Sequence, residues 1–226
     1  EDTLSLHDAL PIYMLNSKQQ AVVMENERLK NENLTTRYNM LVGQINPHFF
    51  MNTLNNIHAL IDIDTEYAKS AVIELSKMMR YVLYESGSET ISLKKDIQFI
   101  ENYIELMRIR YDSSIDIRFD YPDSIPNKVA IPPLLLIVFV ENAFKHGVSY
   151  NHASFIQIRI GYRDDAVTAV ISNSRHEKSR PGTTGIGLEN VKKRLALIYQ
   201  DNYTLAIDDS DPAVYTVKLI IPIMPC

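Results

Sequence analysis

Apolar residues recur at helical spacing on two successive segments between positions 47 and 85. The first segment follows Pro47, and its apolar residues lie four, three and four positions apart: Phe50, Leu54, Ile57 and Ile61. The second segment has the apolar residues Ala68, Val72, Leu75, Met79 and Val82. Both spacings predict amphipathic helices, and Asp64 or Thr65 is the expected N-cap of the second. Because one antiparallel hairpin buries little by itself, the two stripes predict a four-helix bundle formed by a homodimer.

The segment upstream, residues 13–46, predicts one polar helix. Its heptad positions hold Met24, Asn31, Tyr38 and Ile45, with Leu34 and Leu41 at the matching d positions. Gln20 and Glu27 occupy the earlier d positions. The pattern therefore favours a short coiled-coil linker over residues 13–43, with a solitary solvated helix as the alternative. Residues 1–12 do not continue this pattern, and we treat them as a tail of doubtful origin outside the fold.

Beyond residues 85–89, helical and strand patterns are mixed. Ser92 is the expected N-cap of a helix through Tyr111, and Pro132 is expected to open an apolar helix that ends at Gly147. Another helix is predicted over residues 188–200. Alternating positions predict strands over residues 115–121, 155–162, 166–172, 203–207 and 214–221. The mixture predicts an α+β fold, with a helical-hairpin dimerisation domain over 44–90 and an α/β sandwich over 91–226.

Composition excludes several classes of protein. The formal net charge is −5, which argues against direct nucleic-acid binding. Cys226 is the single cysteine; it cannot form an internal disulfide, so a reducing compartment fits, and we expect an inert tail residue. No apolar run reaches the roughly 18 residues of a membrane span.

The segment 44–57, QINPHFFMNTLNNI, offers a candidate nucleophile. At about 100° per residue, His48 lies roughly opposite the apolar stripe, and Asn52 and Asn55 share that exposed face. A neutral imidazole is a competent nucleophile near neutral pH. The alternative is an incidental surface histidine.

The segment 140–147, VENAFKHG, places a carboxylate, an amide and a cation on one helix. Glu141 and Lys145 form one i, i+4 pair, and Asn142 and His146 form another. The Asn142 carbonyl oxygen suits Mg²⁺ that also contacts phosphates, and Lys145 and His146 are able to meet phosphate oxygens. The alternative is a helix end capped by Gly147.

The segment 185–195, GIGLENVKKRL, is glycine-rich and is expected to open a helix. Backbone N–H groups at a helix N-terminus can hold phosphate, with Lys192 and Arg194 adding charge nearby. A glycine pair of this kind also occurs in loops that bind nothing.

Together and in this order, the three segments resemble the LytS-type sensor histidine kinases, as do IENYIELMRIRY at 100–111 and IPPLLL at 131–136. The resemblance implies a GHKL-type ATP-binding domain, a phosphoacceptor His48 and a phosphotransfer role for Glu141. Asn52 is expected at the catalytic face, and Asn142 is expected to hold Mg²⁺. The remaining residues implied to contact ATP are Lys145, His146, Ser172, Asn173, Gly185, Ile186, Gly187 and Leu188, with residues 174–184 as the ATP lid.

The resemblance also implies partners and a location. The chain is expected to phosphorylate itself from Mg-ATP as a homodimer, and to pass the phosphoryl group to an aspartate of a response regulator of the LytTR type. It is expected to be the cytoplasmic domain of a bacterial inner-membrane protein whose sensor region lies outside this sequence.

Two departures from the family pattern leave questions open. The acidic residue that reads the adenine amino group is replaced within Ser172-Asn173-Ser174; loss of a charged hydrogen bond would weaken ATP binding roughly ten- to a hundred-fold. Ser172 or Asn173 can partly substitute, and restoring the acid with Ser172→Asp is expected to tighten ATP binding. Phe49 stands where many histidine kinases carry an acid, so either Glu141 takes the proton or the histidine needs little help.

Two other functions fit the same residues. In a GHKL ATPase, Glu141 would activate water and no phosphoprotein would form. In a degenerate nucleotide-sensing scaffold, no phosphoryl transfer would take place, and the replacement of the adenine-site acid is the feature that favours this alternative. Such a protein would signal by changing the geometry of its dimer.

Overall fold

The computed structural model describes residue 24 and residues 47–111, 115–126, 128–149, 151–163, 165–176 and 185–224. The chain separates into two units, Glu1–Ile45 and Asn46–Cys226. The predicted tail over 1–12 and the coiled-coil linker over 13–43 fall almost entirely outside the described residues. No helix among the described residues is both long and apolar enough to cross a bilayer.

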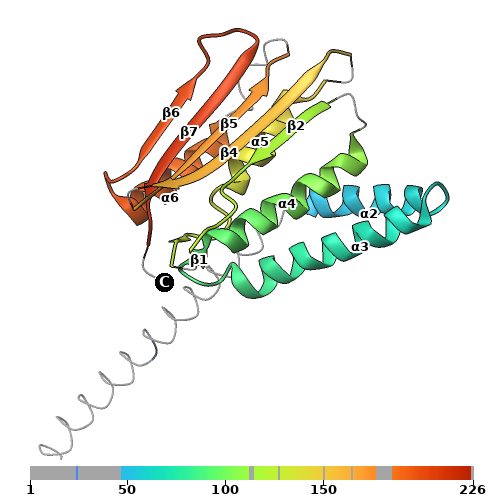
Figure 1. Cartoon of the computed structure of the whole chain (residues 1–226), viewed down its shortest axis with the longest axis horizontal. Helices are drawn as coiled ribbons and strands as arrows, with labels where there is room; N and C mark the ends of the chain where they lie inside the picture. The colour runs from blue at the N-terminus through green and yellow to red at the C-terminus, as the bar shows by residue number, and fades with distance from the viewer. Residues whose placement is uncertain are drawn as a thin grey trace, which may run out of the picture. The chain divides into compact units, whose positions relative to one another are not determined.

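The predicted helical hairpin is present as α2 (Pro47–Ile61) and α3 (Thr65–Arg80) (Figure 1). Asp64 is the N-cap of α3, as predicted: its Oδ1 accepts a hydrogen bond from the Tyr67 backbone N–H at 2.9 Å. The face of α3 that is buried differs from the predicted stripe, and it consists of Ala68, Ala71, Leu75 and Met78. Val72 and Met79, which the spacing placed in the core, are 48% and 36% exposed. The hairpin therefore has more apolar surface than its own contacts cover.

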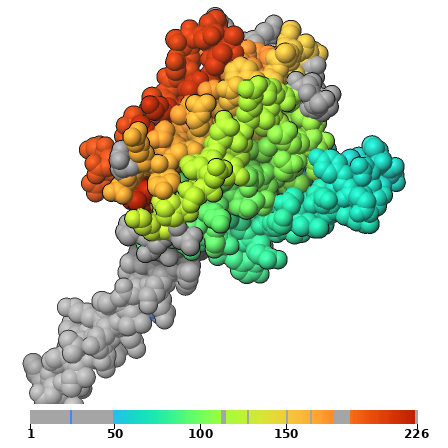
Figure 2. Space-filling model, viewed as in Figure 1, coloured from blue at the N-terminus to red at the C-terminus, as the bar shows by residue number. Residues whose placement is uncertain are grey.

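A π-helical turn, η1 (Tyr81–Glu85), extends α3 and leads to the short strand β1 (Ile91–Ser92) and to α4 (Leu93–Arg110). Ser92 occupies the N-cap position, as predicted, although its side chain makes no capping hydrogen bond. Because α4 packs against both α2 and α3, the hairpin and the sheet belong to one compact unit. The hairpin turn projects beyond the body of this unit (Figure 2).

All five predicted strands are present, and they form one sheet. The strand order is β2–β4–β5–β7–β6, with β2 and β4 parallel and the other neighbours antiparallel. The bounds are β2 (Ile115–Asp120), β4 (Ser154–Arg163), β5 (Ala166–Ser174), β6 (Thr204–Asp208) and β7 (Val214–Pro222). The helices lie on one face of the sheet (Figure 1), where alternate strand residues are buried. The chain therefore has the predicted α+β fold with a sandwich-like sheet and helix layer.

The helix α5 (Ile137–Gly147) begins five residues later than predicted. A residue that precedes proline avoids the helical region, which keeps Ile131 and Pro132 out of a helix, and Leu134 has a left-handed φ of 57°. The segment before α5 is therefore an irregular loop that follows the short strand β3 (Ala130–Ile131). The last helix, α6 (Gly185–Tyr199), begins three residues earlier than predicted.

Candidate active site

The carboxylate Glu141 lies on α5, which packs against β4, β5 and α6. Burial raises the pKa of Glu141 to about 7, and the positive charge of Lys145, one turn later, lowers it in part. A carboxylate with a pKa near 7 can both take and release a proton at neutral pH. Glu141 is therefore chemically suited to act as a general base.

Asn142 and His146 lie one turn apart on α5, and both are partly exposed. Burial lowers the pKa of His146, and the neighbouring Lys145 lowers it further, so the imidazole is a neutral group that can donate or accept a hydrogen bond. Asn142 offers a neutral carbonyl oxygen. Across the described ranges no three His, Cys, Asp or Glu side chains gather as a metal site. Mg²⁺ bound by few protein ligands and by phosphate oxygens fits this donor set.

The C-terminus of α5 is fixed against the end of β5. A Cβ atom on Gly147 would lie 2.6 Å from the Cβ of Asn173, so only glycine permits this approach. The Ser174 hydroxyl donates to the Gly147 carbonyl at 2.7 Å, and Asn173 Nδ2 donates to the Ser174 carbonyl at 2.8 Å. Gly147 thus serves as a close-contact residue, and Asn173 is buried on the face of the sheet that α5 covers.

Ser172 lies on the opposite face of β5 from Asn173. Its Oγ is 2.9 Å from the Thr216 Oγ1 of the neighbouring strand β7, whereas Val167, Ala169, Ile171 and Asn173 point toward the helices, as the alternating burial requires. The predicted contact of Ser172 with the adenine stays a prediction, and it would require the adenine to lie on the face of the sheet away from the helices. The run of apolar inward residues was the sequence signal that could have assigned this face to Asn173.

Gly185, Ile186, Gly187 and Leu188 form the first turn of α6, so the prediction that this glycine-rich segment opens a helix is confirmed. The N–H groups of a first helical turn have no intrahelical partner and can bind an anion. A Cβ on Gly187 would meet no atom of the described residues within 4 Å. Of the predicted lid, residues 177–184 lie outside the described residues.

His48 lies in the first turn of α2, and its side chain is outside the described residues. The next residue, Phe49, stacks on Tyr103 of α4 with ring centroids 4.9 Å apart, and Tyr103 meets Phe144 of α5 edge-on at 5.6 Å. Burial raises the pKa of Tyr103, and the nearby negative charge of Glu141 raises it further. This aromatic chain links the His48 segment, through α4, to the helix that carries Glu141. Asn52, one turn after His48, is partly exposed as predicted.

Sequence reasoning missed the aromatic chain. Tyr103 and Phe144 both lie within segments that carry the family resemblance, but no spacing rule links positions 49, 103 and 144. Only the packing of α2, α4 and α5 brings the three rings together.

The chain is similar in sequence to known proteins. Residues 36–115 match the protein-family model described as Histidine kinase. The Sensor protein LytS of Staphylococcus saprophyticus is 33% identical over 199 residues, covering 80% of this chain and 33% of that protein. The Sensor protein LytS of Staphylococcus haemolyticus is 30% identical over 213 residues, covering 88% of this chain and 35% of that protein. This chain thus spans about a third of the length of these relatives.

A solved structure also aligns with the chain. The histidine kinase domain of a blue-light activated histidine kinase from Erythrobacter litoralis is 13% identical with a TM-score of 0.45, covering 78% of this chain and 93% of that chain.

Proposed function

We propose that this chain, which is similar in sequence to LytS sensor proteins and matches the Histidine kinase model over residues 36–115, is the transmitter of a two-component sensor that transfers the γ-phosphoryl group of ATP to His48. One observation carries this proposal: the aromatic chain from Phe49 through Tyr103 to Phe144 joins the His48 segment to the helix of Glu141. A nucleophile and a base on separate elements are thereby held in one packed unit.

The proposed reaction is an in-line displacement. A ring nitrogen of His48 attacks the γ-phosphorus, an N–P bond forms, and the bond from the γ-phosphorus to the ADP oxygen breaks. Glu141 accepts the imidazole proton, for which a pKa of about 7 is suited. Since Phe49 replaces the acid that often follows the phosphoacceptor, Glu141 is the base that we favour.

The nucleotide is proposed to lie between α5 and the first turn of α6. Backbone N–H groups of Gly185 to Leu188 would hold phosphate oxygens, with Lys145 and His146 supplying further donors. Mg²⁺, held by Asn142, would neutralise phosphate charge as the transition state forms. For the adenine we propose Asn173, because its amide lies on the covered face of the sheet, whereas the hydroxyl of Ser172 bonds to Thr216 on the other face.

The resemblance to these kinases also supports a proposal for the assembly and the partners. We propose that a homodimer forms through the apolar surface of α2 and α3 that remains exposed. The phosphoryl group would pass to an aspartate of a response regulator, which we expect to be of the LytTR type. The proposed location is the cytoplasmic side of a membrane protein whose sensor lies outside this sequence.

Incubation with γ-labelled ATP and magnesium tests the proposal. We expect an acid-labile label on the protein that maps to His48. Release of phosphate without protein label would support the ATPase alternative, and nucleotide binding without turnover would support the scaffold alternative.

A further inference from the structure

Asp96 is a completely buried carboxylate in the first turn of α4, remote in sequence from every segment named above as catalytic. Its Oδ1 accepts a hydrogen bond from the Tyr81 hydroxyl of η1 at 2.7 Å and one from the Leu134 backbone N–H at 3.3 Å. Its Oδ2 is buried and has no hydrogen-bond partner among the described residues. Burying a carboxylate is unfavourable unless it is well paired, so other interactions must offset the cost of burying Asp96.

The loop before α5 provides the first part of that explanation. The Leu134 N–H and the Pro133 carbonyl belong to one peptide group, and the carbonyl accepts a hydrogen bond from Arg194 Nη2 of α6 at 2.7 Å. Asp96 and Arg194 therefore hold the two ends of the same peptide group. Leu134 has the left-handed φ of 57°, an unfavourable conformation for a residue with a Cβ that must be held by its surroundings.

Asp96 and Arg194 also interact electrostatically. Burial raises the pKa of Asp96 to about 6, while the hydrogen bonds from Tyr81 and Leu134 and the charge of Arg194 lower it. Burial lowers the pKa of Arg194, and the charge of Asp96 raises it. The buried carboxylate of Asp96 and the partly buried guanidinium of Arg194 therefore stabilise each other across the Pro133–Leu134 peptide.

We propose that Asp96 and Arg194 are positioning residues: by clamping the Pro133–Leu134 peptide they couple the end of the helical hairpin to the two helices of the nucleotide site. Tyr81 connects the hairpin to the clamp through η1, the clamped peptide leads directly into α5, and Arg194 belongs to α6. This inference rests on the proposed kinase function, since the coupling serves phosphoryl transfer from the nucleotide to His48.

The geometry predicts which step the clamp affects. The clamp residues are separate from the groups proposed to bind ATP, so its loss should leave nucleotide affinity nearly unchanged. The clamp orients α5, and thereby Glu141, relative to the hairpin, so its loss should slow phosphoryl transfer, which depends strongly on alignment. Helical turns of the π type often occur at functional positions, and η1 is the element through which hairpin movement would reach Asp96.

The test compares Asp96→Asn, Tyr81→Phe and the double variant with the wild type. For Asp96→Asn we expect the maximal autophosphorylation rate to fall at least tenfold, with the ATP dissociation constant within about twofold. Tyr81→Phe should act in the same direction more weakly, and the double variant should lose less than the product of the single losses, because both act through one contact. Glu105→Gln, at an exposed carboxylate of the same helix, is the matched control and should change neither quantity.

A purely structural role gives a different result. Lower melting temperatures with wild-type labelling rates would overturn the proposal, as would equal losses of rate and affinity. If Asp96→Asn does not fold, Tyr81→Phe, which removes one hydroxyl, decides by the same criteria.

Amide hydrogen exchange of the nucleotide-free protein separates this inference from the proposed function. Asp96→Asn should accelerate exchange in η1 and at the start of α5 together, whereas acceleration confined to α4 would overturn the clamp. An unlabelled wild type would end the kinase proposal, and the exchange result would still decide whether the clamp couples the two regions.

Discussion

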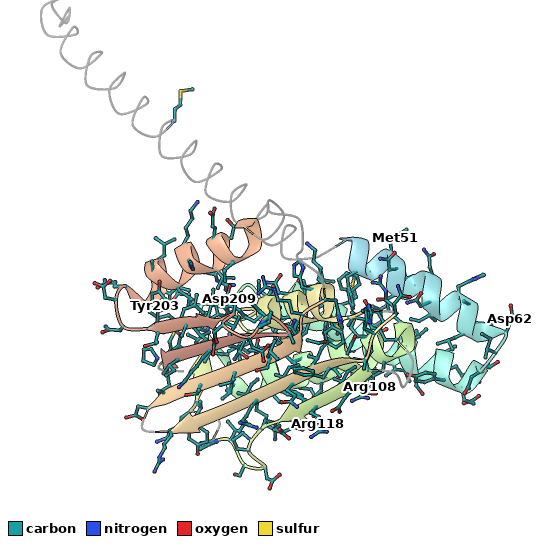
Figure 3. All side chains as sticks on the ribbon, turned by 90° about the horizontal axis from the view of Figure 1, so that it is seen from above. Met51, Asp62, Arg108, Arg118, Tyr203 and Asp209 are labelled. Atoms are coloured by element: carbon teal, nitrogen blue, oxygen red, sulfur yellow. The ribbon has the colours of Figure 1, made fainter. Side chains whose placement is uncertain are left out.

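The hairpin α2–α3 and the sheet with its helices differ in how completely they bury their apolar residues. On the hairpin, the side chains of Met51 in α2 and Ile73 in α3 are 60% and 55% exposed. Leu83, in the η1 turn that extends α3, is 59% exposed. In the sheet, Ile156 and Leu219 are fully buried. Figure 3 shows the hairpin turn, marked by Asp62, and the start of β6, near Tyr203, at opposite ends of this unit. The sheet region completes its core within one chain, whereas the hairpin does not.

This difference indicates a division of tasks. A region with a closed core can present binding groups with fixed geometry. A region with a large uncovered apolar surface is typical of an interaction site. We therefore expect changes in the hairpin to alter phosphoryl transfer and assembly, and changes in the sheet region to alter folding and nucleotide binding.

The largest contrast is expected from His48→Ala. Because the proposed nucleophile lies on the hairpin and the groups proposed to bind the nucleotide lie on α5 and α6, this variant should lose all autophosphorylation and keep its ATP affinity. Asn142→Ala should show the opposite behaviour: because Asn142 is the proposed Mg²⁺ ligand, this variant should lose magnesium-dependent nucleotide binding together with activity. Labelling with γ-labelled ATP and calorimetry measure both. Label at the wild-type level in His48→Ala would show that the phosphoacceptor is another residue.

Removal of a core side chain from the sheet should be costly. Leu219→Ala is expected to lower the free energy of unfolding by about 2–5 kcal/mol, because a fully buried leucine leaves a cavity. Urea titration followed by circular dichroism provides the measurement, with Leu197→Ala as the control since Leu197 is 82% exposed. Similar losses for both variants would contradict the described core.

A charge on the hairpin should act on assembly instead. Val72→Asp places a carboxylate on the uncovered face of α3, so we expect at least a tenfold weaker dimer, because a charge at the core of an interface must be desolvated. The helical content should remain. Light scattering over a range of concentrations tests this, with Ser70→Asp, about 200° around the helix, as the control. An unchanged dimer in Val72→Asp would place the interface elsewhere.

The two faces of β5 provide a smaller contrast. Asn173→Asp should tighten ATP binding by about tenfold, because a charged hydrogen bond to the adenine amino group exceeds a neutral one. GTP should not gain, since guanine presents an acceptor at the corresponding position. Ser172→Asp should leave both affinities unchanged, in contrast to the expectation from sequence alone. Calorimetry measures the affinity of both variants for ATP and GTP. Tighter ATP binding by Ser172→Asp would show that the adenine contacts the face of β5 on which Ser172 lies.

The smallest predicted effect concerns pH. With a pKa of about 7 for Glu141, the phosphorylation rate should fall about fivefold between pH 7 and pH 6, as the base is protonated. Glu141→Gln should be slower and should lose this part of the profile, leaving only the titration of His48. A profile identical in both proteins would exclude Glu141 as the base.

Lowering the pH should slow phosphorylation, but through Glu141 it should increase the free energy of unfolding. Its pKa is raised above the ordinary value of 4.5 on folding, so protonation favours the folded state. This stabilisation is complete below about pH 4.5 and is lost as the pH rises through about 7. Urea titrations of the wild type and Glu141→Gln across this range should reveal the difference.

Much of the fold was accessible from local patterns. The strand alternation and the helical stripes act over a few residues, which is why all five strands and the hairpin were predicted within a few positions. The start of α5 was misjudged because the consecutive prolines at 132 and 133 exclude helix there. The buried stripe of α3 was rotated because the packing of α4 decides which apolar residues are covered.

Local spacing and motifs were enough to predict most of the helices and strands, the resemblance to LytS-type kinases, and His48, Glu141 and Asn142 as candidate site residues. The packing of α5 on the sheet shows that Asn173, and not Ser172, faces α5, because Asn173 lies against Gly147. Likewise, Asp96 and Arg194 meet at one peptide group although 98 positions separate them (194 minus 96). Contacts over such separations depend on how whole elements pack, and no local pattern records them.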